Sequence, residues 1–440
     1  MFTNWGLSTQ VIAISIMIFS YAIIFSEKVN RSIIALFGGA LMIIFGVLTQ
    51  EQAIHSIDFN TISLLLGMMI IVGITEKTGI FQFIAVWVAK KIRANPRALL
   101  ASIAGITAVL SGYIDNVTTV LLMTPVVLKI TNILKVKPFP YLMIIIFSCN
   151  IGGTATLIGD PPNILVGSKI GLNFVDFLEH MTPLSYFLVL LLVIVFDFIW
   201  GRNLKASVKN RAKVTNMHPY AYLKDTTLLK KSLSVLAVVI IGFMFAHNIG
   251  LETGLIAIIG AAALLFLYTL GNHYQDAEDK IHDIFAHIDW VTIFFFVGLF
   301  IIVGGLEFTG ILKAAGHKFV EFTGGDFNKT LYIFLWSAAG ISSVIDNIPF
   351  AATMVPIVET IEAEIGGRAV SLPLWWAILM GAGYGGNGTI IASSANLIVA
   401  GIAAKAGHKI GFLKFMIYGI PTVIISIAIS SIYLYFWFHQ

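Results

Sequence analysis

Two stretches of this chain, SGYIDNVTTVLLMTPV at residues 111–126 and SSVIDNIPFAATMVPI at residues 342–357, place an aspartate and an asparagine in apolar surroundings. The stretches align without a gap at an offset of 231 residues, the difference between Asp346 and Asp115. Carboxylates and amides are rare in such surroundings, because each must find a polar partner or cost free energy. A matched pair of them indicates an internal repeat with a functional role.

The composition around these stretches is that of an integral membrane protein. Of 440 residues, 58% are hydrophobic and 11% are charged, whereas about 25% are charged in soluble proteins. We expect about ten or eleven segments that span the membrane or enter it. The polar blocks are too short for a soluble domain, and a net charge of +4 does not indicate nucleic-acid binding. The N-terminal MFTNWGLSTQ lacks a basic signal-peptide region, so we expect the first apolar run to be a retained helix.

The repeat extends on both sides of the two stretches. At the same offset Asp58 falls on Asp289, and with two more residues of shift Asn163 falls on Asn396. These residue types are the ones that membrane composition makes rare, so the coincidence is not a product of low-complexity apolar sequence. Internal repeats of this kind are typical of secondary transporters, with the binding site at the repeat interface near the membrane midplane.

Loop charges indicate that the two copies have opposite orientations. The loop KKIRANPR (90–97) carries four basic residues, whereas its partner EFTGGDFN (321–328) carries two acidic residues and no basic ones. The segment at 201–231 carries eight Lys or Arg against one Asp. Because cytoplasmic loops are enriched in Lys and Arg, we place the first loop and this linker in the cytoplasm and the partner loop outside.

Each copy contains a re-entrant hairpin and an interrupted helix. The apolar run before Asp115 and the run after it are together too short for two ordinary spans with a loop, so a hairpin that turns at the aspartate fits better. In CNIGGTATLIGDPPN, Gly152, Gly153 and Gly159 permit positive φ, and the proline pair that follows stops a helix. The glycine-rich GAGYGGNG in the second copy predicts a matching break. The predicted fold is an all-α polytopic membrane protein built as an inverted repeat of broken helices and two re-entrant hairpins.

These features divide the chain into five parts. We expect N-terminal membrane helices at 1–57, a first repeat at 58–200, a basic cytoplasmic linker at 201–231, connecting helices and a polar loop at 232–288, and a second, inverted repeat at 289–440. The polar loop carries His282 and His287, a weak metal pattern that a solvated amphipathic loop explains better. An alternative interpretation of the basic linker is an arm that binds lipid or nucleic acid.

The candidate ion-binding residues are the polar side chains at the hairpin tips and helix breaks. They are Asp115, Asn116, Thr118, Thr119, Thr154, Thr156, Asp160, Asn163, Asp346, Asn347, Asn387, Thr389, Ser393 and Asn396. The aspartates of the hairpins are open to two readings, as caps of half-helices or as carriers of a proton or cation. Asp160 has no acidic counterpart in the second copy, and it is either a second titrating group or a turn former.

The same strings resemble the ion transporter superfamily. LSGYIDNVTTVLLMTPV, CNIGGTATLIGDPPNILVGS and ISSVIDNIPFAATMVPIV are similar to the branch that contains arsenite permeases of the ArsB type, sodium/proton antiporters of the NhaD type and the melanosomal P protein. The similarity covers about Asp58 to Gly401. It implies a scaffold domain, usually dimeric, and a transport domain that moves in an elevator-like displacement. In related dicarboxylate carriers the tips read Ser-Asn-Thr, whereas here acids replace the serines, which argues against a di- or tricarboxylate substrate.

The resemblance leaves the transported ion open. The first expectation is efflux of arsenite or antimonite from the cell across the inner membrane in exchange for protons. The alternative is sodium/proton antiport, in which Asp115 and Asp346 would also ligate the metal ion. Cys149 is either a thiol ligand or a small hydrophobe. A channel or a non-transporting sensor is a further class, and the absence of a phosphate loop, of a convincing metal-ligand pair and of a nucleophile beside a base argues against an enzyme or a cofactor.

Overall fold

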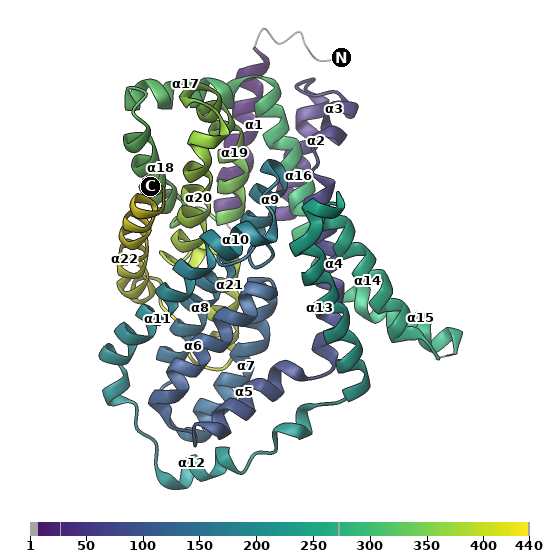
Figure 1. The fold of residues 1–440 in the computed structure, drawn as a ribbon, viewed down its shortest axis with the longest axis vertical. Coiled ribbons are helices and arrows are strands. Elements are labelled where there is room, and N and C mark those ends of the chain that lie inside the picture. Colours follow the sequence, from purple (N-terminus) through teal and green to yellow (C-terminus); the bar gives the residue numbers. More distant parts are fainter. Residues whose placement is uncertain (1–7, 27, 272, 439–440) are drawn as a thin grey trace.

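The computed structural model describes residues 8–26, 28–271 and 273–438, and every regular element in these residues is a helix (Figure 1). Six of the helices are long and apolar enough to cross a membrane, and shorter apolar helices accompany them. The all-α polytopic fold is therefore confirmed. The first apolar run forms α1 (Thr9–Ser26), while residues 1–7 of the N-terminal segment lie outside the described residues.

In the described residues up to Tyr222, the chain forms twelve α-helices and two short 3₁₀ turns. They are α1, α2 (Arg31–Ile44), α3 (Gln50–His55), α4 (Phe59–Lys77), α5 (Ile80–Lys91), α6 (Pro96–Tyr113), α7 (Asn116–Leu134), α8 (Phe139–Gly153), α9 (Pro161–Ile170), α10 (Phe174–His180), α11 (Thr182–Ile199), η1 (Gly201–Asn203), α12 (Val208–Thr215) and η2 (Pro219–Tyr222).

The second half repeats much of this order. It contains α13 (Thr226–Ile249), α14 (Thr253–Thr269), α15 (Tyr274–Ala286), α16 (Trp290–Phe308), α17 (Ile311–Thr323), α18 (Phe327–Ser342), α19 (Asn347–Ile365), α20 (Arg368–Gly385), η3 (Ile390–Ala392), α21 (Ser394–Lys405) and α22 (Phe412–Phe438). Figure 1 shows α5 and α12 at one end of the view and α3 and α17 at the other.

The basic linker defines one side of the molecule, which we call the linker side. Arg211 donates to the carbonyl of Arg93 at 3.0 Å, and Asn210 donates to the carbonyl of Leu134 at 3.3 Å. The start of α6 and the end of α7 therefore lie on this side. The opposite side, which we call the distal side, carries α3 and α17, with Gly304 of α16 close to Ser56 after α3. The two hairpins open toward opposite sides, as the inverted repeat requires.

Two close parallel helix pairs lie outside the hairpins. A Cβ on Gly298 of α16 would overlap the backbone of Ala35 of α2, and one on Gly67 of α4 would lie 2.6 Å from the carbonyl carbon of Ala257 of α14. Small residues at such contacts let helix backbones approach closely in a membrane. Because Gly67 and Gly298 are matched by the repeat, α2 with α16 and α14 with α4 are equivalent pairs. We call these four helices the helix quartet.

The hairpins and broken helices form the second group, which comprises α6–α9, α11 and α18–α22. The hairpin α6–α7 turns at Ile114 and Asp115, and the hairpin α18–α19 turns at residues 343–346. Helix α8 stops at Gly153 and α9 starts at Pro161, while α20 stops at Gly385 and α21 starts at Ser394. The predicted hairpins and breaks are thus present in both copies.

The glycines of the first break do not act as predicted. Gly152, Gly153 and Gly159 are absent from the positive-φ residues of the described chain, so the expectation of left-handed glycines there is wrong. They instead allow close packing, because a Cβ on Gly159 would lie 2.6 Å from the carbonyl oxygen of Ser111 and one on Gly153 would lie 3.1 Å from the Ser111 hydroxyl. The break is pressed against the hairpin, where a larger side chain does not fit.

The polar segment before the second copy is a helix rather than a loop. Residues Tyr274–Ala286 form α15, in which His282 lies 3.9 Å from Glu278 one turn earlier. Pairs at this spacing stabilise an exposed helix. Lys77 pairs with Asp283 of this helix, and the hydrogen bond lowers the pKa of that exposed carboxyl. The segment thus packs α15 against the end of α4.

Candidate ion-binding site

The hairpin aspartates are the N-caps of the helices that follow them. The Asp115 carboxylate accepts from the backbone N–H of Thr118 at 2.9 Å, and the Asp346 carboxylate accepts from that of Ile348 at 3.3 Å. Each interaction satisfies a backbone donor at a helix start, which has no partner within the helix itself. Each aspartate keeps further oxygen lone pairs for other partners.

Asp160 lies between the two hairpin tips. The side chain, in a residue only 1% exposed, accepts from Asn116 Nδ2 at 3.1 Å through one oxygen and from Asn347 Nδ2 at 2.9 Å through the other. The first break thus contacts both hairpins at once, and the two asparagines matched by the repeat serve the same carboxylate. Of the two readings of Asp160, the turn former accounts for its position before α9, but it does not account for these two contacts.

A small cavity adjoins the two asparagines that bind this carboxylate, while Asp160 itself is not among its lining residues. The cavity has a volume of about 20 Å³, which is room for a single water-sized group. Its lining comes from both hairpin tips, both breaks and the quartet: Arg31, Leu65, Met69, Asp115, Asn116, Val117, Pro161, Asp289, Thr292, Asn347, Ile348, Ser393 and Ser394. The two hairpin tips and the two breaks therefore meet at one point, as the sequence predicted.

Acidic groups outnumber basic ones around the cavity. Asp115 and Asp289 line it, Asp160 is bonded to two of its lining asparagines, and Asp346 is bonded to its lining Arg31. Among the described residues that line the cavity, Arg31 is the sole basic side chain. Carboxylate, amide and hydroxyl oxygens in such numbers are ligands that suit a hard cation or a proton.

Arg31 joins the quartet to the second hairpin. Its Nη1 donates to Asp346 Oδ2 at 2.8 Å and to Ser394 Oγ at 2.6 Å, and its Nη2 donates to Thr292 Oγ1 at 3.2 Å. The guanidinium also lies 5.1 Å from the ring centre of Phe295. No sequence pattern indicated this role, because an arginine at the start of an apolar helix is ordinary in a membrane protein.

Asn150 organises the second break from the first broken helix. Its Nδ2 donates to Asn387 Oδ1 and Asn396 Oδ1, each at 3.0 Å, and its Oδ1 accepts from Ser393 Oγ at 3.1 Å. The repeat gives Gly383 at the equivalent position of the second copy, so this network has no symmetric counterpart. Asn150 was not a predicted site residue, although a buried amide inside an apolar helix is a recognisable signal.

Asn163 and Asn396 hold the breaks in shape. Asn163 Nδ2 donates to the carbonyls of Gly153 at 3.2 Å and Thr156 at 2.7 Å, and Asn396 Nδ2 donates to those of Gly386 at 2.7 Å and Thr389 at 2.9 Å. Unwound backbone at this depth needs such partners. These two side-chain amides therefore bind carbonyls of the loops and do not line the cavity.

Three predicted threonines contact the backbone near the breaks, and two belong to α7. Thr156 Oγ1 donates to the Gly112 carbonyl, Thr389 Oγ1 donates to the Ser343 carbonyl at 2.7 Å, and Thr154 Oγ1 donates to the Asn150 carbonyl at 2.7 Å. Thr118 donates its backbone N–H to the capping carboxylate of Asp115. The buried Thr119 hydroxyl has no hydrogen-bond partner in the described part of the chain. None of these five threonines is among the residues that line the small cavity.

Cys149 points its thiol at the hairpin. Its Sγ lies 3.2 Å from Ser111 Oγ and 3.3 Å from the carbonyl oxygen of Asn116, and the residue is fully buried. The thiol is not among the groups that line the small cavity. Of the two readings of Cys149, the structure therefore supports the small buried side chain.

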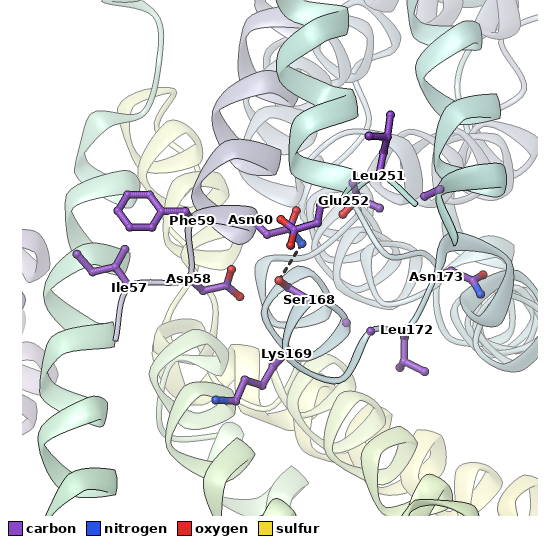
Figure 2. A pocket seen from close by; sticks show the side chains of 14 residues that line it. Ile57, Asp58, Phe59, Asn60, Ser168, Lys169, Leu172, Asn173, Leu251 and Glu252 are labelled. Carbon is purple, nitrogen blue, oxygen red and sulfur yellow. Dashed lines mark hydrogen bonds between the residues drawn. The ribbon is translucent and has the colours of Figure 1, made fainter. Parts of the chain in front are cut away.

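Two larger cavities lie on opposite sides of this site. One of about 360 Å³ on the linker side shares Arg31, Asp346 and Ser394 with the site. The other, of about 560 Å³ on the distal side, is lined by residues such as Asp58, Asn60 and Ser168 (Figure 2). None of the hairpin-tip residues lines the distal cavity. The site thus shares side chains with the linker-side cavity and none of its hairpin-tip residues with the distal one.

Comparisons with known proteins point to a transporter. A family model described as citrate transporter, CitMHS, matches residues 21–381. An uncharacterized transporter of Mycobacterium tuberculosis is 37% identical over 430 residues, which cover 97% of this chain and 98% of that protein. The P protein of Homo sapiens is 31% identical over 516 residues, covering 98% of this chain but 60% of that protein.

The fold also has a solved neighbour. The YdaH transporter of Alcanivorax borkumensis, whose crystal structure was described as having an unusual topology, superposes with a TM-score of 0.62. The match covers 98% of both chains at 14% sequence identity. At this identity the likeness concerns the fold alone.

Proposed function

This chain belongs to the citrate transporter family, CitMHS, and we propose that it exchanges a small hard cation, sodium first, for protons. The family and the transporter relatives confirm that the protein is a secondary transporter of the ion transporter superfamily and not an enzyme. They leave its substrate open, so the choice of ion rests on the side chains of the site.

The observation that carries the proposal is the position of Asp160. A buried carboxylate whose two oxygens face amide groups of both hairpins needs a counter-charge, because neutral donors compensate burial of a charge only in part. A proton or a metal cation supplies that charge. Asp115 and Asp289 add carboxylate oxygens at the cavity wall, and Asn116 and Asn347 add amides. Hard oxygen ligands of this kind suit sodium.

The same side chains argue against a free tricarboxylate as cargo. The family model carries the description citrate transporter, but a citrate anion would face an excess of carboxylates in this chain. The single guanidinium that lines the cavity, that of Arg31, is already paired with Asp346. Like charges in a buried site cost free energy unless they are protonated or metal-bound. We therefore propose no free carboxylate anion for this protein.

Arsenite or antimonite remains the second candidate. The sequence analysis put this cargo first, and the neutral trihydroxide would use the hydroxyl groups of Thr292, Ser393 and Ser394 beside the carboxylates. This cargo is larger than the water-sized cavity of the present state. Cys149 gives it no support, because its thiol is turned toward Ser111 and away from the cavity. Sodium comes before arsenite in our proposal because a neutral cargo does not require the excess of acids.

We further propose that the helix quartet is a scaffold domain and that the hairpin group is a transport domain that moves past it. Asp289 shares the small cavity with Ser394, the first residue of α21, whereas its repeat partner Asp58 shares the distal cavities with Leu165 and Ser168, beyond the first turn of α9. Exact symmetry would put Asp58 beside Pro161. The difference of four to seven residues equals about 6–10 Å along a helix.

This offset supports an alternating-access scheme. The transport domain is displaced toward the linker side in the present state, and the reverse displacement would bring Asp58 to the site and open it to the distal cavity. By the charge rule the linker side is cytoplasmic, so the state faces inward. We place the protein in the inner membrane as a homodimer, with its sodium and protons passing through one site in turn.

The test is ion-driven proton movement in everted vesicles. An imposed pH gradient should collapse when sodium chloride is added, and potassium chloride or citrate should have no such effect. Arsenite in place of sodium reports the second candidate. If no added ion changes the gradient although the protein is present and folded, the antiport proposal is wrong. Counterflow of labelled sodium separates exchange from a channel or a sensor, because neither of these shows countertransport.

A further inference from the structure

We infer that Arg31 is the coupling residue of the carrier: by pairing with Asp346 it tethers the unloaded transport domain to the scaffold in the linker-facing state. This inference rests on the proposed exchange of a cation for protons, with Asp346 as one of the ion-binding carboxylates predicted from the sequence, and goes beyond it, because the proposed function gives the arginine no role in exchange. The pair crosses the boundary between the two helix groups, since Arg31 is on α2 and Asp346 is the cap of α19.

The geometry of Arg31 is that of a clamp. The guanidinium contacts two scaffold residues, Thr292 and Phe295 of α16, and two transport-domain residues, Asp346 and Ser394. The side chains of Arg31 and Asp346 are 21% and 16% exposed, so the pair is mostly shielded from solvent. A planar fork of donors can hold several acceptors at once, and displacement of the transport domain would break the bonds to Asp346 and Ser394 together.

The location of Arg31 at a helix start supports a functional reason. Arg31 is the first residue of α2, where the positive end of the helix dipole disfavours a cation. Asp346 stands at the start of α19, where the dipole favours a carboxylate. The arginine therefore gains its stabilisation from the carboxylate of the other domain and not from its own helix. Loss of that carboxylate's charge would leave it without this compensation.

The repeat makes the tether one-sided. Ala35 of α2 packs on Gly298 as Ala257 of α14 packs on Gly67, so Arg31, four residues before Ala35, corresponds to Thr253, four residues before Ala257. Thr253 lines the distal cavity. A threonine cannot form an ion pair with a carboxylate, so the distal-facing state has no equivalent clamp at this position.

Coupling follows from competition for Asp346. A proton on this carboxylate removes its charge, and a bound cation takes over its oxygens, so either event releases Arg31. The unloaded carrier keeps the pair and stays in the linker-facing state. Exchange is then obligatory, because the domain moves only when it holds a proton or a cation.

The experiment measures the position of the domains without any transported ion. Asn60 of α4 donates to Ser168 of α9 at 2.8 Å across the same boundary (Figure 2). A chain with Asn60→Cys and Ser168→Cys, in membranes at alkaline pH with choline as the cation, is treated with a short thiol crosslinker, and crosslinking is quantified by gel shift. Cys149 is buried and is retained.

In this background Arg31→Gln should lower the crosslinking rate about threefold or more, the size of typical coupling between contacting residues. Asp346→Asn should lower it to the same extent, the double variant should add no further decrease, and Arg31→Lys should retain part of the tether. Arg97→Gln is the matched control, because Arg97 pairs with Asp197 inside one helix group. Elution volume and melting temperature verify that each variant is folded.

An unchanged crosslinking rate in folded Arg31→Gln overturns the inference. A double variant with Asp346→Asn whose rate falls by the product of the two single effects also overturns it, because the two residues would then act independently. Because the readout needs no cargo, a failure of sodium to dissipate the pH gradient would overturn the proposed cargo and leave the tether standing. The reverse result, sodium exchange with no effect of Arg31 on crosslinking, would overturn the tether alone.

Discussion

At the scale of single residues, the polar side chains of the two breaks are of two types. Those of the first type bind side chains of the hairpin tips, and those of the second type bind backbone carbonyls of the break itself. Asp160 is bonded to two side-chain amides, whereas Asn163 and Asn396 are bonded to loop carbonyls. All three are buried to 1% exposure or less. Substitution of the first type should affect exchange, and substitution of the second type should affect stability.

Asp160→Asn should reduce cation-driven proton movement by about a hundredfold, the contribution of a positioned proton-transfer group. The amide keeps the size of the side chain and removes its charge, and Asn116 or Asn347 has to turn its own amide to accept from the new Nδ2. The melting temperature verifies that the variant is folded. Fluorescence of a pH-sensitive dye in vesicles measures the rate. Asp276→Asn on the exposed face of α15 is the control. Full activity of folded Asp160→Asn would contradict the assignment of this carboxylate as the carrier.

Asn396→Ala should destabilise the protein by about 0.5–1.5 kcal/mol for each hydrogen bond that is lost. The carbonyls of Gly386 and Thr389 lose their shorter hydrogen bond, and Asn150 Nδ2 loses one of its acceptors. Each carbonyl keeps a longer bond, from Asn150 Nδ2 at 3.4 Å and from the N–H of Ala392 at 3.3 Å. Thermal unfolding in detergent measures the change, and Asn163→Ala should give an effect of similar size. A variant that melts like the parent but has lost exchange would show that this amide serves the cargo after all.

At the scale of helices, the packing of the quartet depends on glycines at two matched contacts. Gly67 meets Ala257 and Gly298 meets Ala35 at distances that leave no room for a methyl group. Gly73, on the same helix α4 as Gly67, has no atom within 4 Å of an added Cβ. The same substitution in one helix therefore separates packing from helix propensity.

Gly67→Ala should cost about 1–3 kcal/mol through overpacking, whereas Gly73→Ala should be neutral or stabilise by about 0.5–1 kcal/mol because alanine favours the helix. Unfolding in detergent of the two variants beside the parent protein provides the comparison. Equal stability of the two variants would contradict the close α4–α14 contact.

At the scale of the whole molecule, the inverted repeat and the basic linker fix which ends lie on the same side. The start of α6, the end of α7 and α12 share the linker side, and α17 lies at the opposite end in Figure 1. Both 90–97 and 321–328 contain the turn that precedes a hairpin, together with the ends of the flanking helices. Their opposite charge predicts that they face opposite compartments.

Lys91→Cys and Asn328→Cys, each exposed in the structure, should therefore react with a membrane-impermeant maleimide from opposite sides. Intact cells should label Asn328→Cys, and everted vesicles should label Lys91→Cys. The buried Cys149 gives a low background in the parent protein. Labelling of both positions from the same side would contradict the inverted arrangement in the membrane.

The sequence by itself determined the class of protein, the inverted repeat, the hairpins and breaks, and the residue pairs Asp115 with Asp346 and Asn116 with Asn347. These are local signals, because acids, amides, glycines and prolines stand out in an apolar chain and repeat at a fixed offset. The offset also predicted that the two copies meet at one site.

Only the tertiary structure decided which of these groups meet. Asp160 receives Asn347 from 187 positions away, and Arg31 pairs with Asp346 from 315 positions away. Such contacts depend on how helices far apart in sequence pack, and the spacing of residues along the chain does not predict that packing. The same reason explains why Asn163 and Asn396 face loop carbonyls: the shape of an unwound segment is set by its neighbours, not by its own sequence.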